Sequence, residues 1–248
     1  MVRWIGWGFG EALIPIFIFS FSDTFAEAGL FRSVADIVGL LVLPIVGLWA
    51  DRVSARRLIL ISLLIYPLVG AGYFLAGVFG AGIFIVLARA INGLTWQLES
   101  VGVSTYYRRI SPRGIIGSAF GYIDTWSNIG WIAAAGIGIA LLPFVPVHTL
   151  LLLISPFAIF AFFVVRRAPK DVVTAPTTTL LPRHLSVIKP YREAFLQCRS
   201  WNKHLWLLCT LVVFEGIIGT LMWFFIPIDA YAEGARPALV ILLTIVAT

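Results

Sequence analysis

The chain has 248 residues, of which 60% are hydrophobic and only 12% are charged, and its formal net charge is +6. A typical soluble domain is about 45–50% apolar and about 25% charged, so this chain needs a bilayer as the solvent for most of its surface. The basic residues lie in short loops between apolar runs, which is typical of membrane topology and argues against nucleic acid as a partner.

Seven apolar segments are each long enough to cross a membrane, which takes about 20 residues of helix. We predict an all-α, polytopic transmembrane bundle with spans at 4–21, 32–50, 58–78, 81–107, 114–142, 148–165 and 204–228. The first segment could instead be a signal peptide, but Glu11 and Pro15 interrupt it and it exceeds the usual length of such an apolar run.

An eighth apolar run begins near Pro237 and is too short to cross the membrane when the sequence stops at Thr248. We therefore expect the chain to be the amino-terminal part of a longer protein. The predicted organisation is a six-span bundle at 1–165, a cytoplasmic linker at 166–203, and the start of a second bundle at 204–248. After Pro190, apolar residues recur at helical spacing, which predicts an amphipathic helix on the membrane surface; a solvated linker is the alternative.

The distribution of basic residues predicts the orientation. If the spans alternate in direction, all Lys and Arg except Arg32, Arg89 and Arg236 fall on one side of the membrane. Short loops rich in Lys and Arg stay in the cytoplasm. We therefore expect a multi-pass protein of the plasma (inner) membrane with a cytoplasmic amino terminus.

Six ionisable side chains lie within the predicted spans, where a charge is costly and marks a functional site by default. They are Glu11, Asp36, Arg89, Glu99, Asp124 and Glu215. The third and sixth spans carry none, so we expect these two to face lipid while the others enclose a polar interior. At about 1.5 Å of rise per residue, four of the six side chains fall near the membrane midplane: Glu11, Arg89, Asp124 and Glu215.

Glu11 and Arg89 have similar depths and opposite charges, so they are predicted to pair. A carboxylate that alternates between a dry environment and one beside an arginine can take up and release a proton. Glu11 is therefore the leading candidate for a proton carrier on a substrate and proton pathway. The alternative is a static ion pair that holds two helices together.

The turn between the second and third spans carries a charged signature. Gly47, Ala50, Asp51, Arg52 and Arg56 match the pattern Gly-x-Leu-Ala-Asp-Arg-x-Gly-Arg-Lys/Arg, while Trp49, Ser54 and Ala55 depart from it. With six spans, a basic linker and a further group of spans, the chain resembles the major facilitator superfamily of secondary transporters. Two further segments are similar to motifs of that family: Arg89-Ala90-Ile91-Asn92-Gly93, and Trp223-Phe224-Phe225-Ile226-Pro227.

The resemblance implies that spans one, four and seven line a central cavity and that spans three and six lie outermost. It also implies that the acidic and basic side chains of the signature, Asp51, Arg52 and Arg56, form a charge cluster that stabilises one access state. A tight basic turn is the alternative for this segment. The Gly-Pro signature that some drug exporters carry on span five is missing, since Asn128-Ile129-Gly130-Trp131 stands there.

We interpret the chain as part of an alternating-access transporter for a small solute, with proton coupling as a further expectation. The alternative is a non-transporting membrane protein of the same fold, either a sensor or an assembly factor. An intramembrane enzyme is disfavoured because no hydrolase, zinc-protease or ATPase motif occurs. We expect no metal or other cofactor.

Overall fold

The computed structural model describes residues 8, 13–171, 192, 196 and 202–246. Within these ranges the chain is helical and contains no strand. Residues 13–19 are helical and end the predicted first span, whose beginning lies outside the described residues. The principal helices that follow are α2 (Phe25–Arg52), α3 (Ala55–Ile65), α4 (Pro67–Phe79), α5 (Ile83–Ile110), α6 (Ile116–Leu141), α7 (Val147–Leu152), α8 (Ile154–Arg167) and α10 (Lys203–Thr220).

Four helical stretches are long and apolar enough to cross a membrane: Phe25–Arg52, Ala55–Phe79, Val147–Arg167 and Lys203–Ala232. The predicted fourth and fifth spans coincide with α5 and α6, which have 28 and 26 residues. These two helices are less apolar because they carry side chains such as Arg89, Glu99 and Asp124. The predicted amphipathic helix after Pro190 falls largely outside the described residues.

Local capping explains where the second helix begins. The hydroxyl of Thr24 accepts a hydrogen bond from the Glu27 N–H, and the Glu27 carboxylate accepts one from the Asp23 N–H. These bonds satisfy amide groups that have no partner inside the helix. As a result α2 begins at Phe25, before the predicted start of the apolar span at residue 32.

Prolines divide three of the spans. Because proline has no N–H to donate, the third span separates into α3 and α4 at Pro67, and the sixth separates into α7 and α8 beside Pro156. The Ser155 hydroxyl donates a 2.7 Å hydrogen bond to the Pro67 carbonyl and so joins α8 to α4. The seventh span passes through a π-helical turn, η2 (Leu221–Phe225), directly before α11 (Ile226–Ala232), which contains Pro227.

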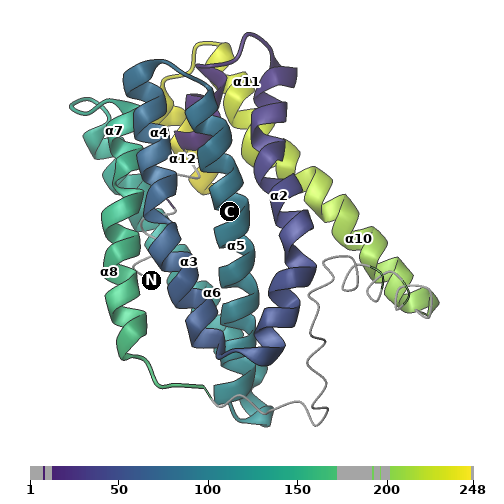
Figure 1. Cartoon of the computed structure of the whole chain (residues 1–248). Coiled ribbons are helices and arrows are strands. Elements are labelled where there is room, and N and C mark those ends of the chain that lie inside the picture. Colours follow the sequence, from purple (N-terminus) through teal and green to yellow (C-terminus); the bar gives the residue numbers. More distant parts are fainter. Residues whose placement is uncertain (1–7, 9–12, 172–191, 193–195, 197–201, 247–248) are drawn as a thin grey trace.

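Helix α5 occupies the middle of the bundle, where it packs against α2, α3 and α4 (Figure 1). The α2–α5 approach is close at Gly93, where an added Cβ atom would lie 2.1 Å from the Ala35 carbonyl oxygen. On the other side of α5, the Ser62 hydroxyl of α3 donates a 2.8 Å hydrogen bond to the Thr95 carbonyl. Helix α10 diverges from this bundle, and no residue of α10 is buried.

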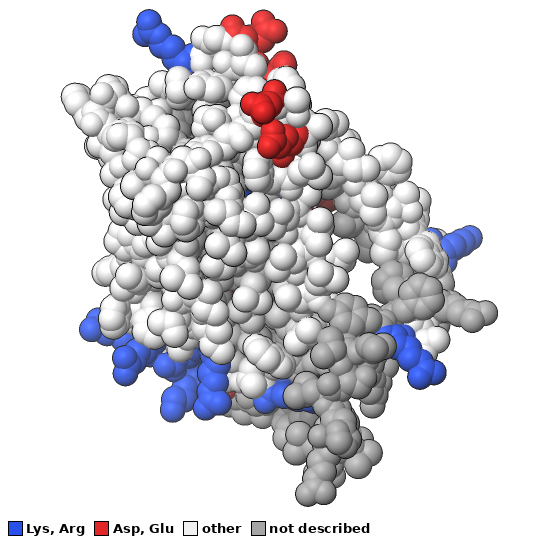
Figure 2. Space-filling model, turned by 45° about the horizontal axis from the view of Figure 1, so that its top comes forward, with Lys and Arg blue, Asp and Glu red and all other residues white. Residues whose placement is uncertain are grey.

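The two ends of the molecule carry charges of opposite sign. Figure 2 shows many Lys and Arg side chains along one edge and acidic residues toward the opposite end, where a basic side chain also projects, with a largely uncharged band between the two ends. We call the first the basic end; it carries the α2–α3 turn and the ends of α5 and α8. The acidic end carries the starts of α2 and α5 and the α11–α12 connection, where α12 (Pro237–Val246) follows Glu233 and Arg236. This band is the expected signature of a bilayer-spanning protein.

Candidate functional site

A cavity of about 560 Å³ lies between the helix of residues 13–19, α2, α5 and the α10–η2 segment. Its volume falls within the range of about 300–1,000 Å³ that is usual for small-molecule sites. Charged and polar side chains from α2 and α5 line it: Arg32, Asp36, Arg89, Asn92 and Gln97. The part of the chain described for the third and sixth spans contributes no residue to this wall.

Arg89 is the most deeply placed charge in the cavity wall, with 3% of its surface exposed. Its Nη2 donates a 3.0 Å hydrogen bond to the Arg32 carbonyl of α2, while its Nε has no hydrogen-bond partner. Arg89 forms no ion pair with any residue that the structure describes. A buried cation without a carboxylate partner is costly, and the predicted partner, Glu11, is not among the described residues.

Asn92 lies one helical turn from Arg89 on the same face of α5. It is 4% exposed, lines the cavity, and leaves its Oδ1 without a hydrogen-bond partner. Gly93, which follows it, also lines the cavity and allows α2 to approach. The segment Arg89–Gly93 therefore combines two functions: its polar residues face the cavity and its glycine permits the close contact between helices.

The other cavity charges compensate each other. Arg32 and Asp36 are one turn apart on α2, and Arg32 Nη1 lies 3.1 Å from Asp36 Oδ1. This pair is partly solvated, since 61% of the Asp36 side chain is exposed. A solvated pair contributes little net charge or stability, so Arg89 dominates the electrostatics of the described wall.

The α10–η2 segment supplies an apolar and aromatic wall. Gly216 and Gly219 line the cavity from α10, and Trp223 and Phe224 line it from the π-helical turn. Trp223 packs edge-to-face on Trp131 of α6, with ring centroids 5.8 Å apart. Single π-helical turns are found frequently at functional sites, and this one directs two aromatic residues to the cavity.

The structure brings together only some of the side chains predicted for the pathway. Arg89 and Asp36 share the cavity, whereas Glu99 is buried further along α5 and is not part of its wall. Asp124 on α6 and Glu215 on α10 are exposed and do not line the cavity. Glu11 lies outside the described residues, so its pairing with Arg89 stays a prediction.

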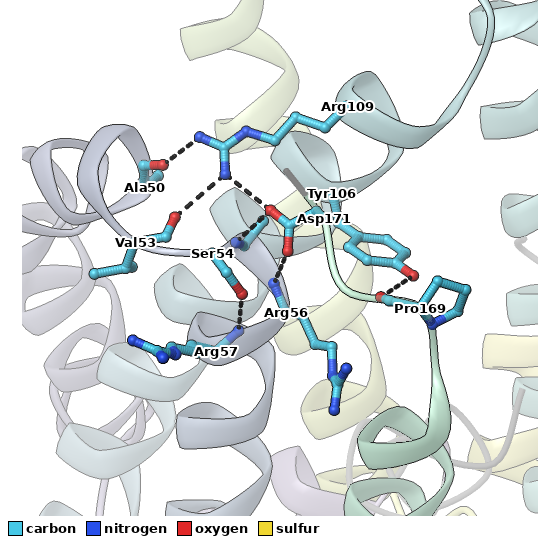
Figure 3. Close-up of polar contacts among 10 residues, drawn as sticks. Ala50, Val53, Ser54, Arg56, Arg57, Tyr106, Arg109, Pro169 and Asp171 are labelled. Atoms are coloured by element: carbon cyan, nitrogen blue, oxygen red, sulfur yellow. Dashed lines mark hydrogen bonds and ion pairs between the residues drawn. The ribbon is translucent and has the colours of Figure 1, made fainter. Parts of the chain in front are cut away.

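A second polar site forms at the basic end around Asp171, which follows α8 (Figure 3). Its carboxylate is buried and accepts hydrogen bonds from the N–H groups of Ala55 (2.8 Å) and Arg56 (3.2 Å) at the start of α3. It also pairs with Arg109 at 2.9 Å. A carboxylate at a helix N-terminus is stabilised by the free amides and the helix dipole.

Two arginines extend this contact to other helix ends. Arg109 donates to the carbonyls of Ala50 (2.8 Å) and Val53 (3.2 Å), where α2 ends. Arg56 donates to the carbonyls of Ala168 and Arg166, where α8 ends. We call Arg56, Arg109 and Asp171 the basic-end cluster; it ties the ends of α2, α5 and α8 to the start of α3.

Hydrogen bonding determines the protonation state of Asp171. Burial by itself raises the pKa of this carboxyl group, but hydrogen bonds from Arg109, the two α3 amides and the Ser54 hydroxyl outweigh that effect. The net result is a pKa below its usual value. Asp171 is therefore ionised at neutral pH and remains the anion that the surrounding donors require.

The signature residues of the α2–α3 turn occupy different environments. Arg56 belongs to the basic-end cluster, whereas Asp51 and Arg52 are exposed and form no ion pair with another described residue. An added Cβ at Gly47 would meet nothing within 4 Å, so packing here does not explain that glycine. The acid of the cluster is Asp171 rather than Asp51.

The sequence analysis did not predict several polar residues of these sites: Arg32, Asn92, Gln97, Arg109 and Asp171. Asp171 is an acid in the otherwise basic stretch after the sixth span, which is the signal that points to a specific pairing. Its partner amide at Ala55 is 116 residues away in the chain, a distance that no local pattern bridges. Among the described residues, no group of three or more His, Cys, Asp and Glu side chains is placed to hold a metal ion.

Comparison with known proteins adds a family match. The family model described as Major Facilitator Superfamily matches residues 1–247. The Quinolone resistance protein NorA of Staphylococcus aureus strain N315 is 25% identical over 134 residues, which is 54% of this chain and 34% of that protein. The protein of the same name from strain MRSA252 is 24% identical over the same length. The matched stretch thus spans about a third of the length of these curated relatives.

Proposed function

The chain belongs to the Major Facilitator Superfamily, and from that premise we propose that it carries out secondary active transport of a small solute by alternating access. It is an integral, multi-pass membrane protein, as the family and the apolar helices show. The observation that carries the proposal is the 560 Å³ cavity with a buried arginine in its wall. In such transporters, solute binds near the midplane between two bodies that rock about it.

The basic-end cluster supports the mechanical part of the proposal. Rocking requires each helical body to move as a unit, and the cluster joins α2, α3, α5 and α8 through hydrogen bonds to their ends. The cavity is lined by other parts of two of these helices, α2 and α5, away from the ends that the cluster joins. Because the cluster holds these helix ends together, a displacement of α2 or α5 at the cavity would move α3 and α8 with them.

We further propose that the amino terminus and the basic end face the cytoplasm of a plasma (inner) membrane. The separation of charge between the two ends supports this orientation, because short basic loops are retained on the cytoplasmic side. Alternating access moves a solute without a chemical step, so we propose transport rather than an enzymatic activity.

The solute is proposed to be a compact amphiphile. The relatives are named for quinolone resistance, which favours a quinolone as the first solute to test, although the Gly-Pro signature of some drug exporters is absent here. The test is flux of a fluorescent quinolone in proteoliposomes that contain the purified protein, under an imposed pH gradient. We expect flux above that of protein-free vesicles, and flux equal to those vesicles would contradict the proposal.

Proton coupling is a separate part of the proposal and rests on Glu11. In the same proteoliposomes, Glu11→Gln removes a titratable carboxyl while preserving side-chain size. We expect it to abolish the acceleration of flux by the pH gradient and to leave exchange without a gradient intact. Unchanged pH-driven flux in the Glu11→Gln protein would exclude Glu11 as the proton carrier.

A further inference from the structure

We infer that the cavity selects organic anions that carry one carboxylate on a planar apolar body. The inference rests on the proposed function, because it assigns a solute class to the same cavity. It starts from the electrostatics of the wall. Arg89 is a permanent cation that is 3% exposed and lacks an ion-pair partner among the described residues.

Among the described residues, the other titratable groups of the cavity wall do not cancel this charge. Arg32 and Asp36 pair with each other on α2 and are partly solvated. The acidic residue of α10, Glu215, is exposed and absent from the wall, although its neighbour Gly216 lines it. The described wall therefore carries one net positive charge, and a ligand with one negative charge neutralises it.

Hydrogen-bonding capacity points to the same group. The Nη2 of Arg89 is occupied by the Arg32 carbonyl, while its Nε has no hydrogen-bond partner. Asn92, one turn further along, can donate a hydrogen bond to a carboxylate from its Nδ2, whereas its unpartnered Oδ1 is an acceptor and does not bind one. A guanidinium beside an amide matches the two oxygens of a carboxylate, which accepts hydrogen bonds from both.

The opposite wall fits a planar apolar body. Gly216 has no neighbour within 4 Å of an added Cβ, so the space beside α10 is open at that position. Trp223 follows Gly219 by one turn, and its Cδ1 atom lies 3.9 Å from the position of a Cβ at that glycine. Together with Trp96 of α5, this indole provides a face on which an aromatic ring can stack.

The test measures binding rather than transport. The purified protein in lipid nanodiscs is titrated calorimetrically with 2-naphthoate and with its neutral analogue 2-naphthamide at neutral pH. We expect naphthoate to bind at least about tenfold more tightly, because a charge-assisted hydrogen bond is worth about 1.5–3 kcal/mol. Equal affinities for the two compounds would overturn the inference.

Variants localise the preference. Arg89→Gln is expected to remove the preference for naphthoate over naphthamide, whereas Arg89→Lys retains part of that preference. Asn92→Asp places a carboxylate beside Arg89 and is expected to weaken naphthoate by about tenfold; this nearly isosteric change carries the test if Arg89→Gln fails to fold. The matched control is Lys203→Gln, an exposed cation outside the cavity wall.

The outcomes separate the inference from the proposed function. Selective naphthoate binding without flux of any solute would keep the binding site and contradict transport. Gradient-driven flux with no preference for naphthoate over naphthamide would keep transport and overturn the solute class. Naphthoate affinity that is unchanged in Asn92→Asp would also overturn the inference.

Discussion

At the scale of single residues, Asp171 has the clearest structural task. Its buried carboxylate accepts hydrogen bonds from two N–H groups at the start of α3 and forms an ion pair with Arg109. We expect Asp171→Asn to lower the free energy of unfolding by about 2–4 kcal/mol, because a buried charged network loses one partner. Equilibrium unfolding in mixed micelles checks this, with the exposed Asp229→Asn as the matched control. A loss equal to that of the control would contradict the assignment.

The lowered pKa of Asp171 makes a second prediction, concerning pH. A carboxyl group whose pKa is lower in the folded state than in the unfolded state stabilises the protein above its usual value of 3.8, and this stabilisation is lost as the pH falls through the folded-state pKa. We therefore expect the difference in unfolding free energy between the parent protein and Asp171→Asn to be full at neutral pH. It should shrink below about pH 4. If the difference in unfolding free energy grew on acidification, the pKa of Asp171 would be raised rather than lowered in the folded state.

The same residues show what sequence can and cannot predict about the site. Arg89 was predicted as a pathway residue because an arginine inside an apolar helix needs a polar environment, and the structure places it in the cavity wall. Asp171 was missed because its role depends on amides of a helix distant in the chain. Asp124 and Glu215 are also charged residues within predicted spans, but their side chains are exposed. The sequence could not separate them from Arg89 because helix periodicity alone does not tell which face meets a partner.

At the scale of helices, the α2–α5 contact positions the cavity wall. An added Cβ at Gly93 would lie 2.1 Å from the Ala35 carbonyl oxygen, and backbone cannot yield as a flexible side chain does. We expect Gly93→Ala to separate the two helices and to lower the free energy of unfolding by about 1–3 kcal/mol. The measurement is unfolding of the variant beside Gly136→Ala, where an added Cβ meets nothing within 4 Å.

The Gly136→Ala control separates the steric effect at Gly93 from the general effect of replacing glycine by alanine in a helix. Gly136 lies within α6, and alanine is the better helix former, so Gly136→Ala is expected to be neutral or slightly stabilising. If Gly93→Ala were as stable as Gly136→Ala, the close approach of α2 and α5 would not be a requirement of the fold.

Helix existence was predictable, but helix continuity was not. Apolar length marked the spans, but it did not predict the start of α2 after the Thr24 cap. The divisions beside Pro67 and Pro156 follow from the missing amide. The π-helical turn before Pro227 has no sequence signal that separates it from a kink, yet it directs Trp223 and Phe224 to the cavity.

At the scale of the whole molecule, the charge separation predicts which side each end faces. Single cysteines at Ala26, near the acidic end, and at Arg167, near the basic end, are exposed positions; Cys198 and Cys209 are replaced by serine in both variants. We expect Ala26→Cys to react with a membrane-impermeant maleimide in intact cells. Arg167→Cys should react only after the cells are opened. The reverse pattern would contradict a cytoplasmic basic end.

The account depends most on one property, that the cavity opens to each side of the membrane in turn. The direct measurement is labelling of Thr220→Cys, a cavity-lining position, in the same cysteine-free background. Sealed vesicles of both orientations are treated with an impermeant maleimide, with and without transported solute. Alternating access predicts labelling from both sides, with solute changing the ratio of the two rates. Labelling from one side only, whatever the solute, would contradict it.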